Sequence, residues 1–300
     1  MKRLFLAWLV AAWCCVPQAM AQIAFTPADF IKKSGAVKVG KEWQVANAVI
    51  RFEVLDGIAR RIEYFGSPKD TRVAAQLMLL MINNMSSVEV LEKQIRSEWA
   101  KQINLGAFKS PGRYYDVDVD WTSERLYFKV MPRELADLGQ DRLIFGQSGV
   151  LMRVFSDFQC PGCKSFLDTQ MPYITQRWIN TGQLRYSYRH FPLSFHPEAI
   201  PAAIASECAA RENKFWEFHL LLSKSFEFMI HARALKFSNA FEKCLTDPAI
   251  KQIVLSDLRI AQAQNLPATS SVLIGPFLVR DYADMGVFER YMRMARALGK

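Results

Sequence analysis

Long apolar segments are absent from nearly all of this sequence. After the first 21 residues, the most apolar stretch runs from Val73 to Ile82 and is interrupted by Gln76. It is about half as long as the roughly 18 residues that a transmembrane helix needs. Low-complexity tracts and internal repeats are missing as well. With 51% hydrophobic and 22% charged residues among 300, the composition excludes a disordered or fibrous chain and indicates a globular protein of two domains.

Concentrated charge of one sign is missing too. The chain has 38 basic and 29 acidic residues, a formal net charge of +9, but the two signs are mixed throughout and no basic run is interleaved with aromatic residues. We therefore expect no nucleic-acid partner, and the surplus serves solubility and mild attraction to acidic surfaces. Histidine is scarce, with 4 residues, none of which has a carboxylate or a second histidine at ligand spacing. These four are expected to pack or to cap helices: His190, His196, His219 and His231.

The first 21 residues are the one apolar exception, and they have the pattern of an export signal. Lys2 and Arg3 precede an apolar run at residues 4–16, and Ala19-Met20-Ala21 supplies small residues for cleavage. The mature chain is expected to begin at Gln22 and to act in the periplasm or another extracytoplasmic space. An uncleaved membrane anchor is the alternative, although an apolar run this short suits a bilayer poorly.

Residues 22–140 lack histidine and cysteine, and their pattern predicts a small α+β domain. Because its carboxylates fall on solvated strand faces, we expect an interaction or dimerisation module, with a homodimer as one possibility, rather than an active site. Asp56-Gly57 predicts a tight hairpin. The expected elements are helices at 27–33, 71–85 and 88–103, and strands at 51–54, 58–65, 116–121 and 126–130.

A linker is predicted at residues 138–148, and the pattern of apolar and polar residues changes after it. The run at 150–155 is nearly all apolar, as expected for a strand buried on both faces of an α/β sheet. Pro197 is expected to open a helical insertion that continues to about residue 265. The remaining elements are expected as a helix at 163–179, strands at 184–189, 271–274 and 277–280, and a helix at 287–298.

Cys160 and Cys163 form a Cys-x-x-Cys pair where the 150–155 strand gives way to a helix. Residues three apart on a first helical turn are close enough for a disulfide that opens and closes with little movement. The free amides and positive dipole of the helix start favour a thiolate on Cys160, and Cys163, one turn inside, is the expected resolving partner. Pro161 suits the first helical position, and Gly162 allows close approach of a substrate sulfur.

Two structural alternatives to redox chemistry exist for this pair. A four-cysteine zinc site would need a second close pair, whereas Cys208 and Cys244 lie 36 residues apart. A static disulfide across so short a loop would constrain the unfolded chain little. We therefore expect no metal and no cofactor apart from the redox-active disulfide itself.

The Cys-x-x-Cys lies in the first of four ordered motifs. They are Phe155–Cys163, Tyr188–Leu193, His196–Ala199 and Lys214–His219. In these motifs the chain, over about residues 146–300, resembles the DsbA-type thioredoxin-fold disulfide oxidoreductases of bacterial envelopes. The resemblance implies an α/β thioredoxin-like fold with an inserted helical subdomain at about 197–265. It also implies disulfide exchange with exported cysteine-containing proteins and a membrane redox partner.

Three positions depart from the pattern of that family. Val154 replaces a buried carboxylate that assists proton transfer at the resolving thiol. Ser270 stands where a cis-proline faces the disulfide, so the loop containing Thr269 and Ser270, expected to flank the substrate thiol, is predicted to be trans or strained. Gly162 replaces a histidine of strongly oxidising members, so a less oxidising pair is expected.

The sequence therefore predicts an exported protein thiol-disulfide oxidoreductase that uses Cys160 and Cys163. A second, structural disulfide between Cys208 and Cys244 is expected in this compartment, with two buried free thiols as the alternative. Two other functions remain open. One is a disulfide isomerase or reductase kept reduced by a membrane donor. The other is a non-enzymatic binding protein on a degenerate thioredoxin fold, suggested by Val154 and Ser270.

Overall fold

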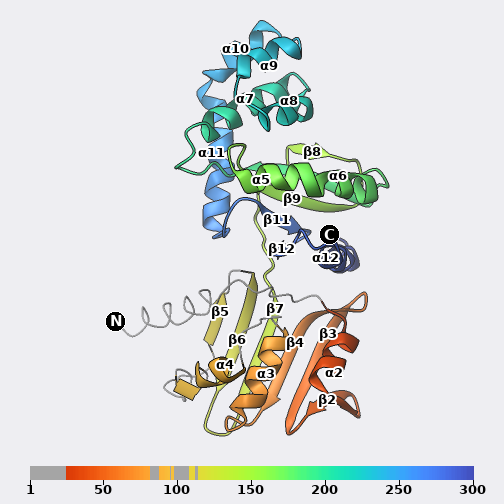
Figure 1. Cartoon of the computed structure of the whole chain (residues 1–300). Helices are drawn as coiled ribbons and strands as arrows, with labels where there is room; N and C mark the ends of the chain where they lie inside the picture. Colours follow the sequence, from red (N-terminus) through yellow and green to blue (C-terminus); the bar gives the residue numbers. More distant parts are fainter. Residues whose placement is uncertain (1–24, 82–87, 95, 98–107, 112–113) are drawn as a thin grey trace. The chain divides into compact units, whose positions relative to one another are not determined.

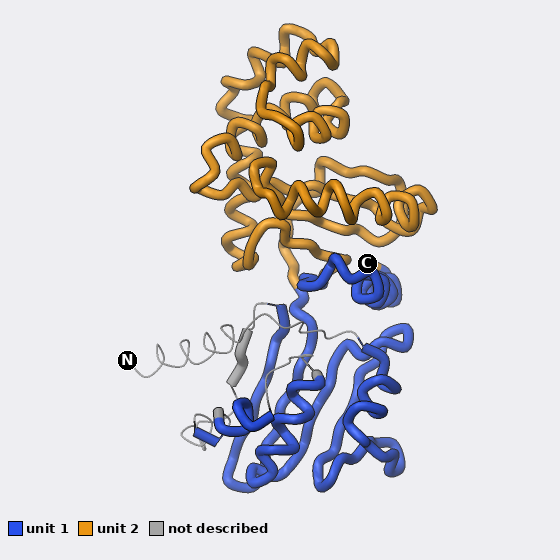
Figure 2. The backbone as a smooth tube through the Cα atoms, viewed as in Figure 1, with its two compact units in different colours: residues 1–134, 277–299 blue, residues 135–276, 300 orange. Residues whose placement is uncertain are grey.

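The computed structural model describes residues 25–81, 88–94, 96–97, 108–111 and 114–300, so the predicted export signal lies outside the described residues. The chain divides into two compact units, residues 1–134 with 277–299, and residues 135–276 with 300 (Figure 2). The predicted domains instead assign 277–299 to the second domain. Among the described helices, none is both long and apolar enough to cross a membrane.

The first unit is built on a seven-stranded antiparallel sheet with helices along one face (Figure 1). In spatial order its strands are β1 (Val37–Val39), β2 (Glu42–Val45), β3 (Ala48–Leu55), β4 (Ile58–Gly66), β7 (Leu126–Pro132), β6 (Tyr115–Trp121) and β5 (Phe108–Pro111). The covering helices are α2 (Pro27–Ser34), α3 (Thr71–Met81) and α4 (Val88–Gln94). Helix α12 (Met285–Ala297) also groups with this unit.

Alternation along the strands explains where the core of this unit lies. In β7 every second residue is buried, and Phe128 stacks on Tyr64 of β4 with ring centroids 4.5 Å apart. The β3–β4 hairpin turns at Asp56 and Gly57, both with positive φ, as the sequence predicted for an Asp-Gly turn. The strands predicted at 116–121 and 126–130 are also present as the antiparallel pair β6–β7, where buried and less buried residues alternate.

Three strands of this sheet were not predicted. β1, β2 and β5 are only three or four residues long, and β1 is exposed at every position. β1 and β2 do alternate polar and apolar residues, but runs of three or four residues are too short for alternation to indicate a strand. The parts of the predicted helices at 82–87 and 98–103 fall outside the described residues.

The second sheet contains the Cys-x-x-Cys strand at its centre. Its order is β12 (Phe277–Val279), β11 (Ser271–Ile274), β9 (Val150–Ser156), β10 (Leu184–His190) and β8 (Leu143–Phe145). β9 and β10 run parallel, as expected for a strand-helix-strand unit, while β8 and β11 pair antiparallel to them. The prediction of a plain linker at 138–148 was wrong, because β8 lies within it and Leu143 is buried against the sheet.

The helix after the cysteines follows the predicted path but alternates between two helical forms. α5 (Pro161–Ser165) and α6 (Met171–Ile174) are α-helical, and the turns at Phe166–Gln170 and Thr175–Ile179 are wider π-helical turns. Pro172, which lacks a backbone donor, follows the first π turn directly. The buried side of this segment carries Phe166, Ile174 and Trp178, as its spacing predicted.

Five helices form the insertion and have a core of their own. They are α7 (Ala199–Arg211), α8 (Phe215–Leu222), α9 (Phe228–Ala234), α10 (Asn239–Leu245) and α11 (Pro248–Ala263). Phe218 of α8 and Phe241 of α10 lie at the centre of this core, with ring centroids 5.6 Å apart. The first helix begins at Ala199, two residues after the predicted start at Pro197.

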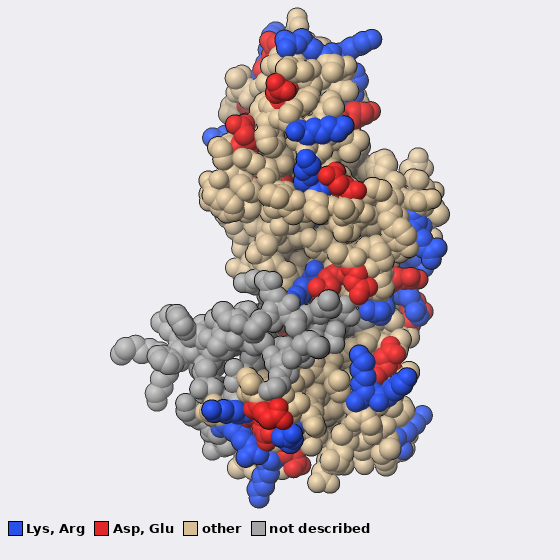
Figure 3. Space-filling view, in the orientation of Figure 1, with Lys and Arg blue, Asp and Glu red and all other residues tan. Residues whose placement is uncertain are grey.

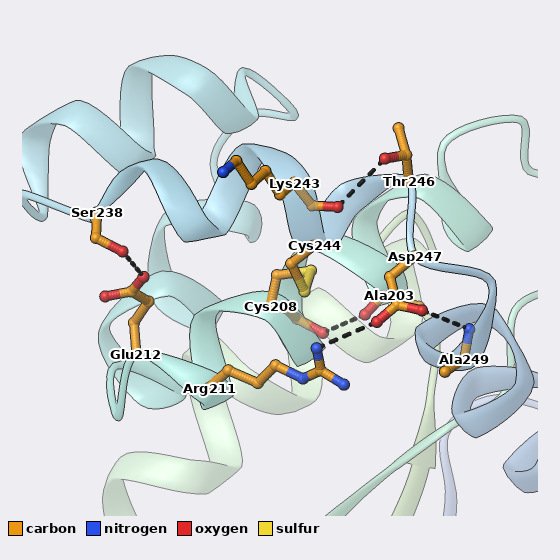
Figure 4. Close-up of a disulfide and its surroundings, with 11 residues drawn as sticks. Ala203, Cys208, Arg211, Glu212, Ser238, Lys243, Cys244, Thr246, Asp247 and Ala249 are labelled. Atoms are coloured by element: carbon orange, nitrogen blue, oxygen red, sulfur yellow. Dashed lines mark hydrogen bonds and ion pairs between the residues drawn. A yellow bond between two sulfur atoms is a disulfide. The ribbon is translucent and has the colours of Figure 1, made fainter.

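A disulfide links two helices of the insertion (Figure 4). Cys208 of α7 and Cys244 of α10 are both buried, and their bond closes a segment of 36 residues. Nearby, Arg211 of α7 forms an ion pair with Asp247, whose side chain also caps the start of α11 by accepting from Ala249 N. The disulfide and this ion pair connect α7 to α10 and to the start of α11.

Candidate active site

The two cysteines lie at the junction of β9 and α5. Cys160 is the residue just before the first helical turn, with extended backbone (φ −74°, ψ 120°), and Pro161 occupies the first position of the helix. Both thiols are free in the structure; Cys160 is half-buried and Cys163 is 6% exposed. The sulfur that sits on the unpaired amides of the helix start is therefore also the sulfur that a partner can reach.

A buried carboxylate shapes the loop before Cys160. Asp157 is 2% exposed, and its Oδ1 accepts a hydrogen bond from Gln159 N at 2.7 Å. Its Oδ2 accepts from Leu193 N and from His196 Nδ1, each at 2.8 Å. Asp157 thus connects the first motif to the loop that follows β10, where the second and third motifs meet. His196, which was expected only to pack or to cap a helix, makes a contact that the sequence did not predict.

The loop before β11, which contains Thr269 and Ser270, also contacts the cysteines. In its protonated form, the Cys160 thiol donates to the backbone carbonyl of Thr269, with Sγ and O 3.8 Å apart. The Thr269–Ser270 peptide bond is cis, so the trans alternative expected above was wrong. The structure therefore brings Thr269 and Ser270 to the cysteine pair, although Thr269 lies 109 residues after Cys160 in the sequence.

The surroundings of Cys160 lower its pKa from the ordinary value of 9.0 to about 5. The main cause is a hydrogen bond from the Cys163 thiol to the Cys160 thiolate, opposed in part by burial. The Thr269 side chain and the backbone amides of Cys163 and Gly162 add to the effect. At neutral pH Cys160 is thus ionised and is both a good nucleophile and a good leaving group.

Cys163 is shifted in the opposite direction. Its hydrogen bond to Cys160 and its burial both raise its pKa, and the hydroxyls of Ser156 and Ser270 oppose them. The Ser270 hydroxyl is buried without another partner among the described residues and acts on Cys163, whereas Thr269 acts on Cys160. The pair therefore shares one proton, which stays on the inner sulfur.

Aromatic side chains enclose the inner cysteine from the side of the insertion. Tyr188 of β10 and Phe158 pack edge-on against His219 of α8, with ring centroids 5.0 and 5.3 Å away. Burial lowers the pKa of His219 to about 3, with a smaller contribution from His190, so this imidazole is neutral at physiological pH. Val154 of β9 is paired with Tyr188 of the adjacent strand β10 and is buried.

A buried ion cluster supports β10 just beyond the site. Arg189, 1% exposed, donates to Asp257 Oδ1 of α11 at 2.7 and 3.0 Å, and His190 N donates to Asp257 Oδ2. His190 Nε2 lies 3.0 Å from Glu207 Oε1, and Arg142 contacts both carboxylates. Tertiary structure thus supplies the carboxylate partner that no sequence spacing indicated for His190.

The described part of the chain offers no metal centre. No group of three or more histidine, cysteine, aspartate or glutamate side chains there is arranged to hold an ion. On the face shown in Figure 3, basic and acidic side chains are intermixed rather than gathered by sign. The chemistry of this site rests on its sulfur atoms.

The part of the chain that contains the cysteine pair is similar to known proteins. Residues 146–287 match the model of the thioredoxin family. Disulfide bond formation protein D of Bacillus subtilis is 26% identical over 165 residues, which cover 49% of this chain and 72% of that protein. An Na⁺/H⁺ antiporter NhaA of Salinispora tropica is 39% identical over 69 residues, 23% of this chain and 10% of that protein. The chain thus spans about a tenth of the first curated relatives that it matches.

Among solved structures, the oxidised form of BdbD from Bacillus subtilis aligns with a TM-score of 0.46 at 22% identity, over 54% of this chain and 97% of that one. A DsbA1 protein of Wolbachia pipientis aligns with a TM-score of 0.45 at 21% identity, over 55% and 96%. The resemblance to DsbA-type proteins stated from the motifs is confirmed. Residues 146–287 have a thioredoxin-like fold with a helical insertion.

Proposed function

We propose that this protein is an enzyme, a thiol-disulfide oxidoreductase that exchanges the Cys160–Cys163 disulfide with cysteines of exported proteins. One observation supports this above all: a reachable sulfur whose pKa is lowered to about 5 lies beside a buried sulfur whose pKa is raised. A static disulfide gains nothing from such a difference, whereas disulfide exchange depends on it.

The exchange runs through a mixed disulfide. A substrate thiolate attacks Cys160 Sγ, the Cys160–Cys163 bond breaks, and Cys163 leaves as a thiolate that takes up a proton. A second substrate thiolate then attacks the substrate sulfur and displaces Cys160, which leaves readily because its thiolate is stabilised. Two electrons pass from the substrate to the cysteine pair, and the disulfide itself is the only redox group required.

The direction of electron flow depends on which redox state is more stable. A stabilised Cys160 thiolate favours the reduced pair and so makes the disulfide oxidising, which supports an oxidase. Gly162, which brings no side chain to stabilise the thiolate further, keeps an isomerase or reductase as the second candidate. The equilibrium reduction potential and the thiol state trapped from cells decide between them: oxidised in cells supports the oxidase, reduced supports the alternative.

The proposal includes a place of action and partners. We place the mature protein in the periplasm or a similar compartment, with a membrane redox partner that resets the pair. The N-terminal domain, which has neither histidine nor cysteine, is proposed to bind a partner or a second copy of the chain. Light scattering of the mature protein and of residues 135–300 tests the homodimer: loss of dimers only in the shorter chain supports it.

Trapping of mixed disulfides tests the proposed chemistry. In Cys163→Ala the Cys160 thiolate attacks a disulfide of an exported protein and releases one of its cysteines as a thiolate. No resolving thiol remains, so mixed disulfides with exported proteins accumulate. Cys160→Ala leaves only the buried sulfur and traps none. Non-reducing gels followed by mass spectrometry identify the adducts. Equal trapping by the two variants, or none by either, contradicts the assignment, and the latter result favours a binding protein without redox activity.

A further inference from the structure

Cys163 must gain or lose a proton during disulfide exchange although its sulfur is buried. The inference about that proton rests on the proposed function. In either direction of exchange the Cys163 sulfur changes between thiol and thiolate. Its side chain is only 6% exposed, and its neighbours hold its pKa above the ordinary value. A proton therefore has to reach a sulfur that bulk water does not touch directly.

A small cavity adjoins Cys163, and neither Thr269 nor Ser270 lines it. Its volume is about 20 Å³, enough for one water molecule, which needs roughly 10–15 Å³. Besides the cysteine, seven polar side chains line it: Ser156, Asp157, Lys164, Tyr186, Tyr188, His219 and Ser223. Lys164 is exposed and Ser223 is half-exposed, so the cavity lies between the sulfur and the protein surface.

Tyr188 gives this cavity a specific polar group. Its side chain is 2% exposed, and its hydroxyl has no hydrogen-bond partner among the described residues. A buried hydroxyl without a partner costs free energy, and a water molecule in the adjoining cavity satisfies it. Burial holds the pKa of Tyr188 well above its ordinary value, so the hydroxyl keeps its own proton and orients water rather than acting as a base.

Asp157 and His219, which also line the cavity, do not take the proton themselves. The two oxygens of Asp157 already accept from Gln159 N, Leu193 N and His196 Nδ1. His219 stays neutral because burial lowers its pKa to about 3. Val154, directly across from Tyr188, brings no polar group.

We propose that a water molecule in this cavity, oriented by the Tyr188 hydroxyl, transfers the proton between Cys163 Sγ and bulk water. In the resolving step the water accepts the proton of the Cys163 thiol and passes a proton outward. The thiolate attacks Cys160 Sγ, the Cys160–Cys163 bond forms, and the bond between Cys160 and the partner sulfur breaks. The partner leaves with the electron pair of that bond. Tyr188 is a positioning residue in this step.

Ellman's reagent separates the two half-reactions without any protein substrate. Cys160 of the reduced protein attacks the reagent and releases one thionitrobenzoate, and Cys163 then resolves the adduct and releases a second. Tyr188→Phe removes only the hydroxyl, so the fold is kept. We expect an unchanged first phase and a second phase slowed about tenfold at pH 6, below the 10²–10⁴ of direct acid–base groups because Tyr188 acts through water. Raising the pH to 8 restores the rate, since hydroxide replaces the oriented water.

Tyr64→Phe is the matched control, because Tyr64 in the first unit is equally buried and its hydroxyl also lacks a partner among the described residues. It leaves both phases unchanged. A second phase of wild-type rate in Tyr188→Phe, or a slowing that persists unchanged at pH 8, overturns the proposal. A wild-type protein without the fast first phase contradicts the proposed function instead, so the two failures are distinguishable.

Discussion

The two units of this molecule bury different kinds of side chain. Among the described residues of the first unit, Thr71 is the one buried polar side chain apart from tyrosine and tryptophan. The second unit buries twelve polar or charged side chains, and they include Asp157, Arg189, Glu207 and Asp257. The first unit instead keeps its ion pairs near the surface, as at Arg72 with Glu89.

This difference shows what each unit is organised to do. Apolar burial stabilises a fold without making any position chemically special. Buried polar groups cost free energy unless they are paired, and such pairing sets loops and sulfur atoms in fixed positions. Asp157 holds the loop before Cys160, and Asp257 holds the end of β10. The second unit thus buries paired polar side chains around the loops and strand that position its two cysteines.

The largest expected effect comes from breaking the buried ion cluster. Asp257→Ala removes the main carboxylate partner of the buried Arg189 guanidinium, which keeps only the more distant Asp141, at 3.6 Å, and the carbonyl of Leu138. We expect a loss of about 3–5 kcal/mol in the free energy of unfolding. Arg72→Ala in the first unit removes exposed ion pairs and is expected to cost about 0–1 kcal/mol. Urea unfolding measures both. Similar losses for the two variants would remove the contrast between the units.

Removing the insertion disulfide is expected to come next. The double variant Cys208→Ala, Cys244→Ala frees a segment of 36 residues and should cost about 3–4 kcal/mol in the chain-entropy model. Hydrogen exchange followed by mass spectrometry locates the loss. Faster exchange in α7–α10 with unchanged exchange in β3, β4 and β7 is expected, and a uniform increase over both units would contradict it.

The pH dependence of stability should also belong to the second unit. The folded pKa of Cys160, about 5, lies below its ordinary value of 9.0, so between these pH values the unfolded state binds more protons. The stability of the reduced protein therefore rises from pH 5 to 9 and is lost as the pH falls through 5. Cys163, whose pKa is raised, opposes this only above pH 9. Cys160→Ser should lack this rise above pH 6.5, the ordinary pKa of histidine. Below that pH the lowered pKa of His219 still makes stability rise with pH. Urea midpoints across the range measure both parts.

The smallest effect is expected at a helix cap of the first unit. Thr26 Oγ1 accepts from Asp29 N at 3.2 Å at the start of α2, and Thr26→Ala should cost about 0.5–2 kcal/mol. Thermal unfolding gives the value, with reactivity of Cys160 toward iodoacetamide as the second readout. That reactivity is expected to stay at the wild-type level, and a change would show that the cap affects the active site.

Local patterns were sufficient for much of the fold. The alternation at 116–121 and 126–130 predicted β6 and β7, Asp56-Gly57 predicted the first hairpin, and Cys160 with Pro161 predicted the helix start. Each depends on chemistry within a few residues. β1, β2 and β5 pair with neighbouring strands but are too short for their pattern to indicate a strand. β8 pairs with the distant β10, where Phe145 lies opposite Tyr186. None of these four strands was predicted.

The sequence by itself determined that Cys160 and Cys163 form a reactive pair at a helix start, because the spacing and the free amides are local properties. Only the tertiary structure decided what acts on that pair. Thr269 meets Cys160 from 109 residues away, and Ser270 acts on Cys163. Tyr188 reaches the cavity beside Cys163 through the pairing of β9 with β10. A hydrogen bond or a pKa shift depends on distance in space, which strand pairing and packing set and which spacing along the chain does not encode.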